Sequence, residues 1–287
     1  MLFLFVIYRY KILLRIYKLC LIIFFVTKNK YNSQGYLFYI IKAKSMKLFF
    51  NEKLNGKEMS LYVKKAEESI DECKLYNEKE LAMIGISLGN SYFSETRLKL
   101  ILSGFSKNFK KVAVLLVDDL SMHNYLAMGY SKEKAKKKIK KASKSISNKI
   151  LKIIDNLKIE NNNDNIKFYK WKDVQAYSGF ENSLKYIYDI YEKNHEFSSE
   201  INKGTLNMIG NYITDDFDEK EVIEEAKWYL LKELAFAYCA SDFFNSSLLT
   251  CYYNDFTIYR NMLKSKYNGL EKQTKHDILI YECVEDG

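Results

Sequence analysis

A serine placed between two glycines is the part of this sequence whose residue types and spacing are best suited to chemistry. Ser87 follows a short apolar run, Leu81 to Ile86, and Gly85 and Gly89 flank it. Glycines on both sides let the backbone turn sharply and let a substrate come close to the hydroxyl. The pattern therefore predicts a nucleophile exposed at the end of a strand. The alternative is that the two glycines only form a tight strand-to-helix turn.

The same pentapeptide matches the G-x-S-x-G elbow of serine hydrolases. A hydrolase of that kind also needs an acid and a histidine downstream of the serine. His195 and His276 are candidates for the histidine, but neither lies in a recognisable loop motif. The serine strand also comes too early in the chain for the usual strand order. A serine hydrolase or acyltransferase is therefore the second interpretation.

A second pair of chemically useful residues lies far downstream. Tyr229 and Glu233 are four positions apart in a segment with helical periodicity, so their side chains project from one face. Their neighbours are largely apolar, which indicates that part of this helix is deeply packed. A carboxylate beside such a surface is a candidate for a shifted pKa and for binding a cationic group. The alternative is an ordinary exposed glutamate.

A lysine-rich stretch is the third feature. Residues 132–152 hold ten lysines and a single acidic residue, Glu133. Like charges at this spacing repel one another along a helix, so we expect an anionic partner, and a phosphate backbone fits best. Few aromatic residues alternate with the lysines, which favours contact with the backbone over stacking with bases.

The pattern of the chain predicts how these residues are positioned. Strands are expected at Leu81–Ile86, Lys111–Asp118, Ile166–Trp171, Ser247–Tyr253 and Asp277–Cys283. Helices are expected at Met59–Tyr76, Ser94–Phe105, Ser131–Leu157, Ser183–Lys193, Ser198–Tyr212 and Glu219–Ala240. This alternation predicts a three-layer α/β fold with a mostly parallel sheet. Such sheets bind ligands at the carboxyl ends of their strands, where Ser87 and Asp118 would lie.

Residues 1–45 differ from the rest of the chain. They contain eight Lys or Arg and no acidic residue, whereas the charges of residues 46–287 are nearly balanced. A membrane-spanning helix needs about 20 predominantly apolar residues, and charges interrupt this segment too often. We interpret residues 1–45 as sequence upstream of a true start at Met46, and residues 46–287 as a single catalytic domain. A basic helix at a membrane surface and a poor membrane anchor are the two less favoured interpretations of residues 1–45.

The cysteines and histidines indicate the cellular compartment and whether a metal site is expected. Five cysteines show no paired spacing, which favours a reducing compartment and hence the cytoplasm. Three histidines are too scattered to indicate a metal cluster.

Taken in order, the motifs resemble the cyclodipeptide synthases. The matching segments are I-G-I-S-L-G-N-S-Y-F-S around Ser87, V-L-L-V-D-D-L, A-M-G-Y-S at Ala127–Ser131, the basic helix, and Y-L-L-K-E-L from Tyr229. The resemblance runs from about Met46 to Tyr253. It implies a Rossmann-like fold similar to the catalytic domain of class I tyrosyl- and tryptophanyl-tRNA synthetases. It also implies that two aminoacyl-tRNAs are joined into a cyclic dipeptide without ATP, and no metal is expected.

The resemblance also implies roles for individual residues. Ser87 would receive the first aminoacyl group as an ester, in a ping-pong mechanism, and Asn90 would belong to the same motif. Tyr229 and Glu233 would hold the α-amino group of that aminoacyl moiety. The first substrate pocket would be apolar and lined by Met83, Gly85 and Phe236. The lysines expected to contact tRNA are Lys134, Lys136, Lys137, Lys138, Lys140, Lys141 and Lys144.

The match departs from the family pattern at one functional position. The usual tyrosine–histidine pair is replaced by Tyr252, Tyr253 and Asn254. Either Tyr252 is the catalytic tyrosine and Tyr253 replaces the histidine, or Tyr253 is catalytic. Because side chains alternate along a strand, we expect only one of the two to reach the site. A tRNA-binding protein of this fold without turnover is the third interpretation, and the amino acids joined are left open.

Overall fold

The computed structural model describes residues 46–64, 80–162, 164–210, 218–254, 256–271 and 275–286. The chain divides into two units, Met1–Lys47 and Leu48–Gly287, and the fold below is that of the second unit. The extension expected at residues 1–45 lies outside the described residues. In the part of the chain that the structure describes, no helix has the length and apolar character needed to span a membrane.

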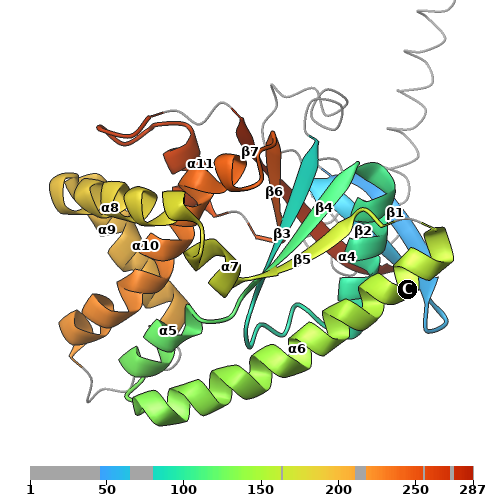
Figure 1. Ribbon diagram of the computed structural model, residues 1–287, viewed down its shortest axis with the longest axis horizontal. Helices are drawn as coiled ribbons and strands as arrows, with labels where there is room; N and C mark the ends of the chain where they lie inside the picture. Colours follow the sequence, from blue (N-terminus) through green and yellow to red (C-terminus); the bar gives the residue numbers. More distant parts are fainter. Residues whose placement is uncertain are drawn as a thin grey trace, which may run out of the picture. The chain divides into compact units, whose positions relative to one another are not determined.

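A seven-stranded sheet forms the centre of the fold (Figure 1), in the order β1-β2-β7-β6-β3-β4-β5. The strands are β1 Met46–Leu54, β2 Lys57–Lys64, β3 Leu81–Ser87, β4 Lys111–Val117, β5 Ile166–Lys170, β6 Leu248–Tyr252 and β7 His276–Asp286. The five strands from β7 to β5 run parallel, and β2 is antiparallel to β7. The mostly parallel sheet predicted from the sequence is therefore confirmed.

Helices cover both faces of this sheet, which gives three layers (Figure 1). The helices are α4 Glu95–Asn108, α5 Ser121–Ala127, α6 Lys132–Asn161, α7 Trp171–Gln175, α8 Ser178–Lys193, α9 His195–Ile209, α10 Glu219–Phe243 and α11 Thr257–Leu263. Along β3, Ala82, Ile84 and Ile86 pack toward α4 and α6. Leu81 and Met83 pack into the opposite core with α8 and α10.

The helix predicted over Met59–Tyr76 is wrong in its described part, because residues 57–64 form β2. Asn55 and Gly56 connect β1 to β2 with positive φ angles of 51° and 82°. Asn-Gly is the preferred sequence for such a hairpin turn. Leu61 is buried opposite Cys283 of β7. The alternation of Met59, Leu61 and Val63 agrees with a strand, so the prediction of a helix missed a local signal. Residues 65–79 lie outside the described part.

A buried carboxylate at the end of a strand forms a hydrogen bond with the basic helix α6. Asp118 directly follows β4 and is 5% exposed. Its Oδ2 accepts a hydrogen bond of 2.6 Å from the Ser143 hydroxyl in α6. Lys170 at the end of β5 donates to Ser143 at 3.1 Å and lies 3.8 Å from Asp118. Ala135 and Ile139 are buried on the same helix. The position of α6 beside the strand ends is therefore set by polar and apolar contacts together.

Candidate active site

Ser87 is the last residue of β3, at the carboxyl end of the parallel sheet. It pairs with Val117, the last residue of β4. The chain then turns through Gly89, whose φ of 73° is a left-handed conformation that glycine adopts without strain. Ser94 caps the next helix by accepting a hydrogen bond from the Arg97 N–H. This local sequence thus presents the serine hydroxyl beyond the edge of the sheet.

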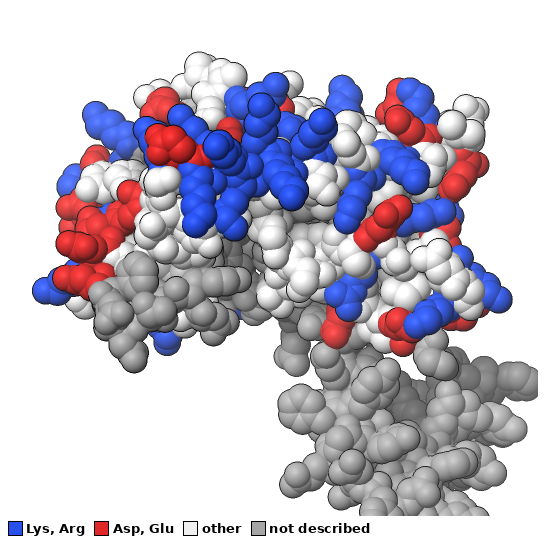
Figure 2. Space-filling model, turned by 90° about the horizontal axis from the view of Figure 1, so that it is seen from below, with Lys and Arg blue, Asp and Glu red and all other residues white. Residues whose placement is uncertain are grey.

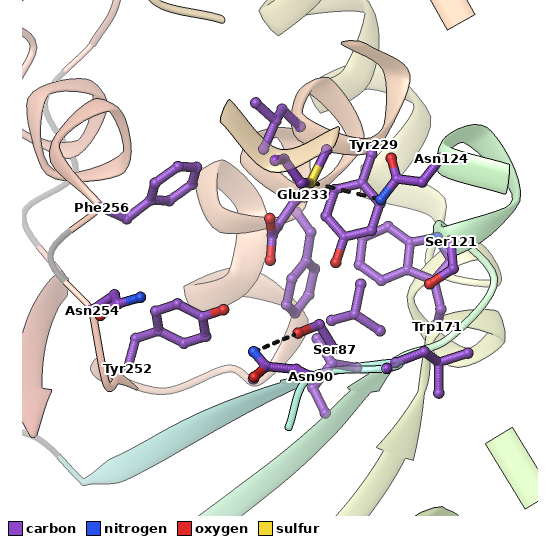
Figure 3. A pocket seen from close by; sticks show the side chains of 18 of the residues that line it. Ser87, Asn90, Ser121, Asn124, Trp171, Tyr229, Glu233, Tyr252, Asn254 and Phe256 are labelled. Atoms are coloured by element: carbon purple, nitrogen blue, oxygen red, sulfur yellow. Dashed lines mark hydrogen bonds between the residues drawn. The ribbon is translucent and has the colours of Figure 1, made fainter. Parts of the chain in front are cut away.

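A cavity of about 640 Å³ opens at this edge, with Ser87 in its wall. One wall is the sheet, to which β3, β4, β6 and β7 contribute residues such as Met83 and Val117. Helix α10 forms the opposite wall with Tyr229, Leu230, Glu233 and Phe236. Figure 3 shows side chains from these elements converging on one space. A Cβ on Gly85 would meet nothing within 4 Å, so the missing side chain adds to the open volume.

Asn90 is held in one orientation beside the serine. Its Oδ1 accepts a 3.0 Å hydrogen bond from the Tyr92 N–H. Its Nδ2 is therefore directed to the Ser87 Oγ at 3.3 Å and to the Tyr253 hydroxyl at 2.7 Å. The amide donates to the serine oxygen, so it is suited to orienting this hydroxyl (Figure 3).

Glu233 and Tyr229 lie on the face of α10 that borders the cavity, with their polar ends directed into it (Figure 3). Burial raises the pKa of the Glu233 carboxyl to about 7. Burial, together with the charge of Glu233, raises the pKa of Tyr229 well above its usual value. A carboxyl in such a place gains most from a cationic partner, because the partner replaces the lost water.

Both Tyr252 and Tyr253 line the cavity, so the expectation that only one reaches it is wrong. The strand β6 ends at Tyr252, and side-chain alternation no longer applies to Tyr253. The Tyr252 ring points toward Ser87 and Glu233 (Figure 3). Burial and the nearby Glu233 raise the pKa of Tyr252, and its hydrogen bond with Ser87 opposes this rise.

Tyr253 is instead part of an aromatic stack. Its ring lies 3.9 Å from that of Tyr92, nearly parallel at 13°. Its hydroxyl is the acceptor for Asn90.

Several residues of the cavity were not found from the sequence. Thr250 lines the cavity, and its hydroxyl donates to His276 Nε2 at 2.7 Å, because His276 Nδ1 donates to the Ala237 carbonyl. Tyr259 of α11 lies 3.2 Å from the Thr250 hydroxyl. Ser121 and Asn124 of α5, and Trp171, also line the cavity. No local sequence signal marks these residues, since they meet only through the tertiary fold.

Among the described residues, no histidine lines the cavity. His276 is buried and bonded as above, and His195 begins α9. The serine therefore has no imidazole base of the kind that a hydrolase triad requires. Within the same part of the chain, no group of three His, Cys, Asp or Glu side chains is arranged to hold a metal ion.

The predicted tRNA-contacting lysines are all exposed on α6. Figure 2, which views the molecule from below relative to Figure 1, shows Lys and Arg side chains gathered on this face. Lys138 also lines the cavity. The basic helix therefore reaches the cavity that holds Ser87.

Comparison with known proteins assigns the family. The cyclodipeptide synthase family model matches residues 67–276. Cyclo(L-leucyl-L-leucyl) synthase of Staphylococcus haemolyticus is 24% identical over 216 residues, which cover 73% of this chain and 91% of that protein. A Mycobacterium tuberculosis structure that relates cyclodipeptide synthetases to type I tRNA synthetases is similar in fold. Its TM-score is 0.64 at 16% identity, over 85% of this chain and 98% of the other.

The fold is also similar to that of a cyclodipeptide synthase from Candidatus Glomeribacter gigasporarum bound to Phe-tRNAPhe. The TM-score is 0.56 at 16% identity, over 72% of this chain and 89% of that chain. The family match covers most of the chain, and the fold similarity agrees with it. The chain therefore belongs to the cyclodipeptide synthase family.

Proposed function

We propose that this protein joins two aminoacyl groups from aminoacyl-tRNAs into a cyclic dipeptide, with Ser87 as the covalent acceptor. The observation that carries the proposal is the Ser87 hydroxyl, which borders a cavity opposite the Glu233 carboxyl and accepts a hydrogen bond from Asn90. An aminoacyl-tRNA ester is already activated, so a positioned hydroxyl is the main requirement for transfer.

The first half-reaction is transesterification. The Ser87 oxygen attacks the ester carbonyl, the bond to the terminal ribose breaks, and the serine proton passes to the departing ribose oxygen. The α-ammonium of the aminoacyl-Ser87 ester is held by the Glu233 carboxylate and the Tyr229 hydroxyl, which border the same cavity.

The second half-reaction forms two amide bonds. The amine of the acyl-enzyme attacks the second aminoacyl-tRNA ester and releases its tRNA. The free amine of the resulting dipeptidyl ester then attacks the ester carbonyl at Ser87, which closes the ring and returns the proton to the serine. Glu233 is suited to take up the amine protons as a general base, because its pKa of about 7 is near the working pH.

The test is production of cyclic dipeptide by the full chain. The chain is expressed in a bacterial host and the medium is analysed by mass spectrometry for diketopiperazines. Purified chain is also mixed with a set of charged tRNAs. We expect a diketopiperazine in both. Folded protein that forms none from any charged tRNA would reject the proposal and would favour a tRNA-binding protein without turnover.

We assign this activity to residues 46–287, in the cytoplasm, where charged tRNAs are made. We propose that the reaction needs no ATP, because the ester bonds of the two substrates supply the energy for both amide bonds, and that it also proceeds without a metal ion. Formation of the product without ATP and with a chelator present tests whether the reaction is independent of both.

We propose that Tyr252, rather than Tyr253, is the catalytic tyrosine and that it assists proton transfer during ring closure. The Tyr252 hydroxyl interacts with Ser87 and lies near Glu233, whereas the Tyr253 hydroxyl is engaged by Asn90. We expect Tyr252→Phe to lower the initial rate of product formation about 100-fold or more. We expect Tyr253→Phe to lower it only severalfold, since the ring stack with Tyr92 is retained. The reverse order of the two effects would transfer the role to Tyr253.

The exposed lysines of α6 are proposed to contact the tRNA backbone. Neutralising four of them, Lys136, Lys137, Lys140 and Lys141, to glutamine removes four positive charges from one face. We expect weaker tRNA binding. The slope of log affinity against log salt concentration is expected to decrease in magnitude by up to about 3. The matched control neutralises four exposed lysines elsewhere, Lys172, Lys185, Lys203 and Lys220. If the two sets of substitutions weakened tRNA binding equally, α6 would have no specific role in tRNA binding.

A further inference from the structure

Two tyrosines lie between the catalytic cavity and the basic helix. Tyr125 belongs to α5, and Tyr130 comes just before α6. Both are partly exposed, and both line the cavity that holds Ser87. Their rings meet edge to face, 5.4 Å apart. The Tyr130 N–H donates to the Tyr125 carbonyl at 3.0 Å, and Gly129 makes the turn between them with a φ of 75°. The backbone therefore holds the two rings together.

Two lysines of α6 complete the cluster. The Lys134 ammonium lies 4.8 Å from the centre of the Tyr130 ring. The Lys138 ammonium lies 5.0 Å from the centre of the Tyr130 ring and 5.9 Å from that of Tyr125. Cation–π attraction at these distances keeps the ammonium groups beside the rings. This is the point at which the lysine-rich face of α6 meets the cavity, because Lys138 belongs to both.

Aromatic rings beside a positively charged track are the usual means of binding single-stranded nucleic acid. Bases stack on the rings, and lysines contact the phosphates. The lysine stretch itself has few aromatic residues, which is why its sequence indicated backbone contact alone. The two tyrosines that supply the aromatic surface precede the helix and join it only in the folded chain.

We infer that Tyr125, Tyr130, Lys134 and Lys138 form a binding site for the unpaired 3′-terminal nucleotides of tRNA. The inference rests on the proposed function, since the aminoacyl group is carried by the last of these nucleotides. When the ester carbonyl is at Ser87, the nucleotides behind it leave the cavity past its lining residues. Tyr125 and Tyr130 line the cavity, and α6 lies beside them, so the path toward α6 crosses both rings. The site would couple contact between α6 and the tRNA backbone to delivery of the ester at Ser87.

The test compares two RNA probes on the full-length protein. One probe is intact uncharged tRNA, and the other is the same tRNA without its unpaired 3′-terminal nucleotides. The Tyr125→Leu/Tyr130→Leu variant removes both rings but keeps apolar side chains. Truncating the tRNA is expected to weaken binding to the unaltered protein about tenfold or more. The same truncation is expected to leave binding to the double variant nearly unchanged, because the site for the missing nucleotides is already lost.

Two controls make the result specific. The Tyr125→Phe/Tyr130→Phe variant retains both ring faces and is expected to discriminate between the probes like the unaltered protein. Tyr188→Leu removes a ring that stacks on Trp228 of α10 and does not line the cavity, so it is also expected to leave the discrimination intact. Melting temperatures check that the leucine variants are folded, and a misfolded double variant is replaced by the single substitutions.

An equal effect of truncation on the unaltered protein and on the leucine variants would overturn the inference. Because the assay measures binding of uncharged RNA, it separates this inference from the proposed function. A protein that makes cyclic dipeptide but shows no coupling between the tyrosines and the tRNA end would retain the function and lose the site. A protein that shows the coupling but makes no product would retain the nucleotide-binding site and lose the proposed function.

Discussion

We expect the Ser87→Ala protein to form neither a cyclic dipeptide nor an aminoacyl-enzyme, with the rate of product formation lowered by at least about 1,000-fold. Ser87 is the hydroxyl that Asn90 orients at the end of β3. Its loss removes the oxygen that we propose as the acceptor of the first aminoacyl group. Intact-mass measurement after mixing with an aminoacyl-tRNA is the direct readout. The unaltered protein should gain the mass of one aminoacyl residue, and the variant should gain none.

The control for this experiment is tRNA binding. The contacts with tRNA that we predict lie on α6 and at Tyr125 and Tyr130, and not at Ser87, so the alanine variant should bind uncharged tRNA as the unaltered protein does. An adduct that persists on the variant would place the acceptor elsewhere. Cyclic dipeptide formed without any adduct would exclude the ping-pong mechanism.

The second large effect is expected from Glu233→Gln. The glutamine keeps the shape of the side chain but cannot become an anion or accept a proton as a base. We expect the rate of product formation to fall about 100- to 1,000-fold, which lies within the usual range of a general-base contribution. Single-turnover measurement separates the two half-reactions, and the formation of the amide bonds should be slowed more than acylation of Ser87.

The same substitution should change stability in a pH-dependent way. The pKa of Glu233 is raised from 4.5 to about 7 by burial, so the folded state binds the proton more tightly than the unfolded state. The stability that this proton contributes is fully present below pH 4.5 and is lost as the pH rises through 7. Above pH 7, the buried carboxylate costs about 3 kcal/mol.

Glu233→Gln is therefore expected to raise the melting temperature at pH 8 and to leave it nearly unchanged at pH 5. Thermal unfolding at the two pH values measures this. A variant that is equally or less stable than the unaltered protein at pH 8 would contradict the burial of a carboxylate here. The combined result, a more stable and less active protein, would show that the position is maintained for chemistry at the expense of stability.

Local signals explain what the sequence predicted well. The turn at Gly89 and the four-residue spacing of Tyr229 and Glu233 each depend on a short segment whose geometry follows from the residues in it. The strand β3 is a continuous apolar run and α6 and α10 are long segments rich in helix-forming residues, and each lies within a few residues of its expected bounds.

Contacts between distant segments explain the rest. The error at β2 is an exception, because the Asn-Gly turn and the alternation of Met59, Leu61 and Val63 with less apolar residues are local signals of a strand. The cluster of Thr250, Tyr259 and His276 joins three separate elements and has no local pattern. Tyr253 reaches the cavity because the ladder of β6 stops one residue earlier, and strand ends are not readable from propensity alone.

The place of β7 in the sheet has a consequence for how the protein is made. It is the last described strand in the chain, yet it lies between β2 and β6 in the interior of the sheet. On the ribosome, β2 and the block formed by β6, β3, β4 and β5 emerge first and expose unpaired strand edges on both sides of the gap. Closure of the sheet therefore waits until residues 276–286 leave the exit tunnel. Nascent chains paused before that point are the species most exposed to misassembly.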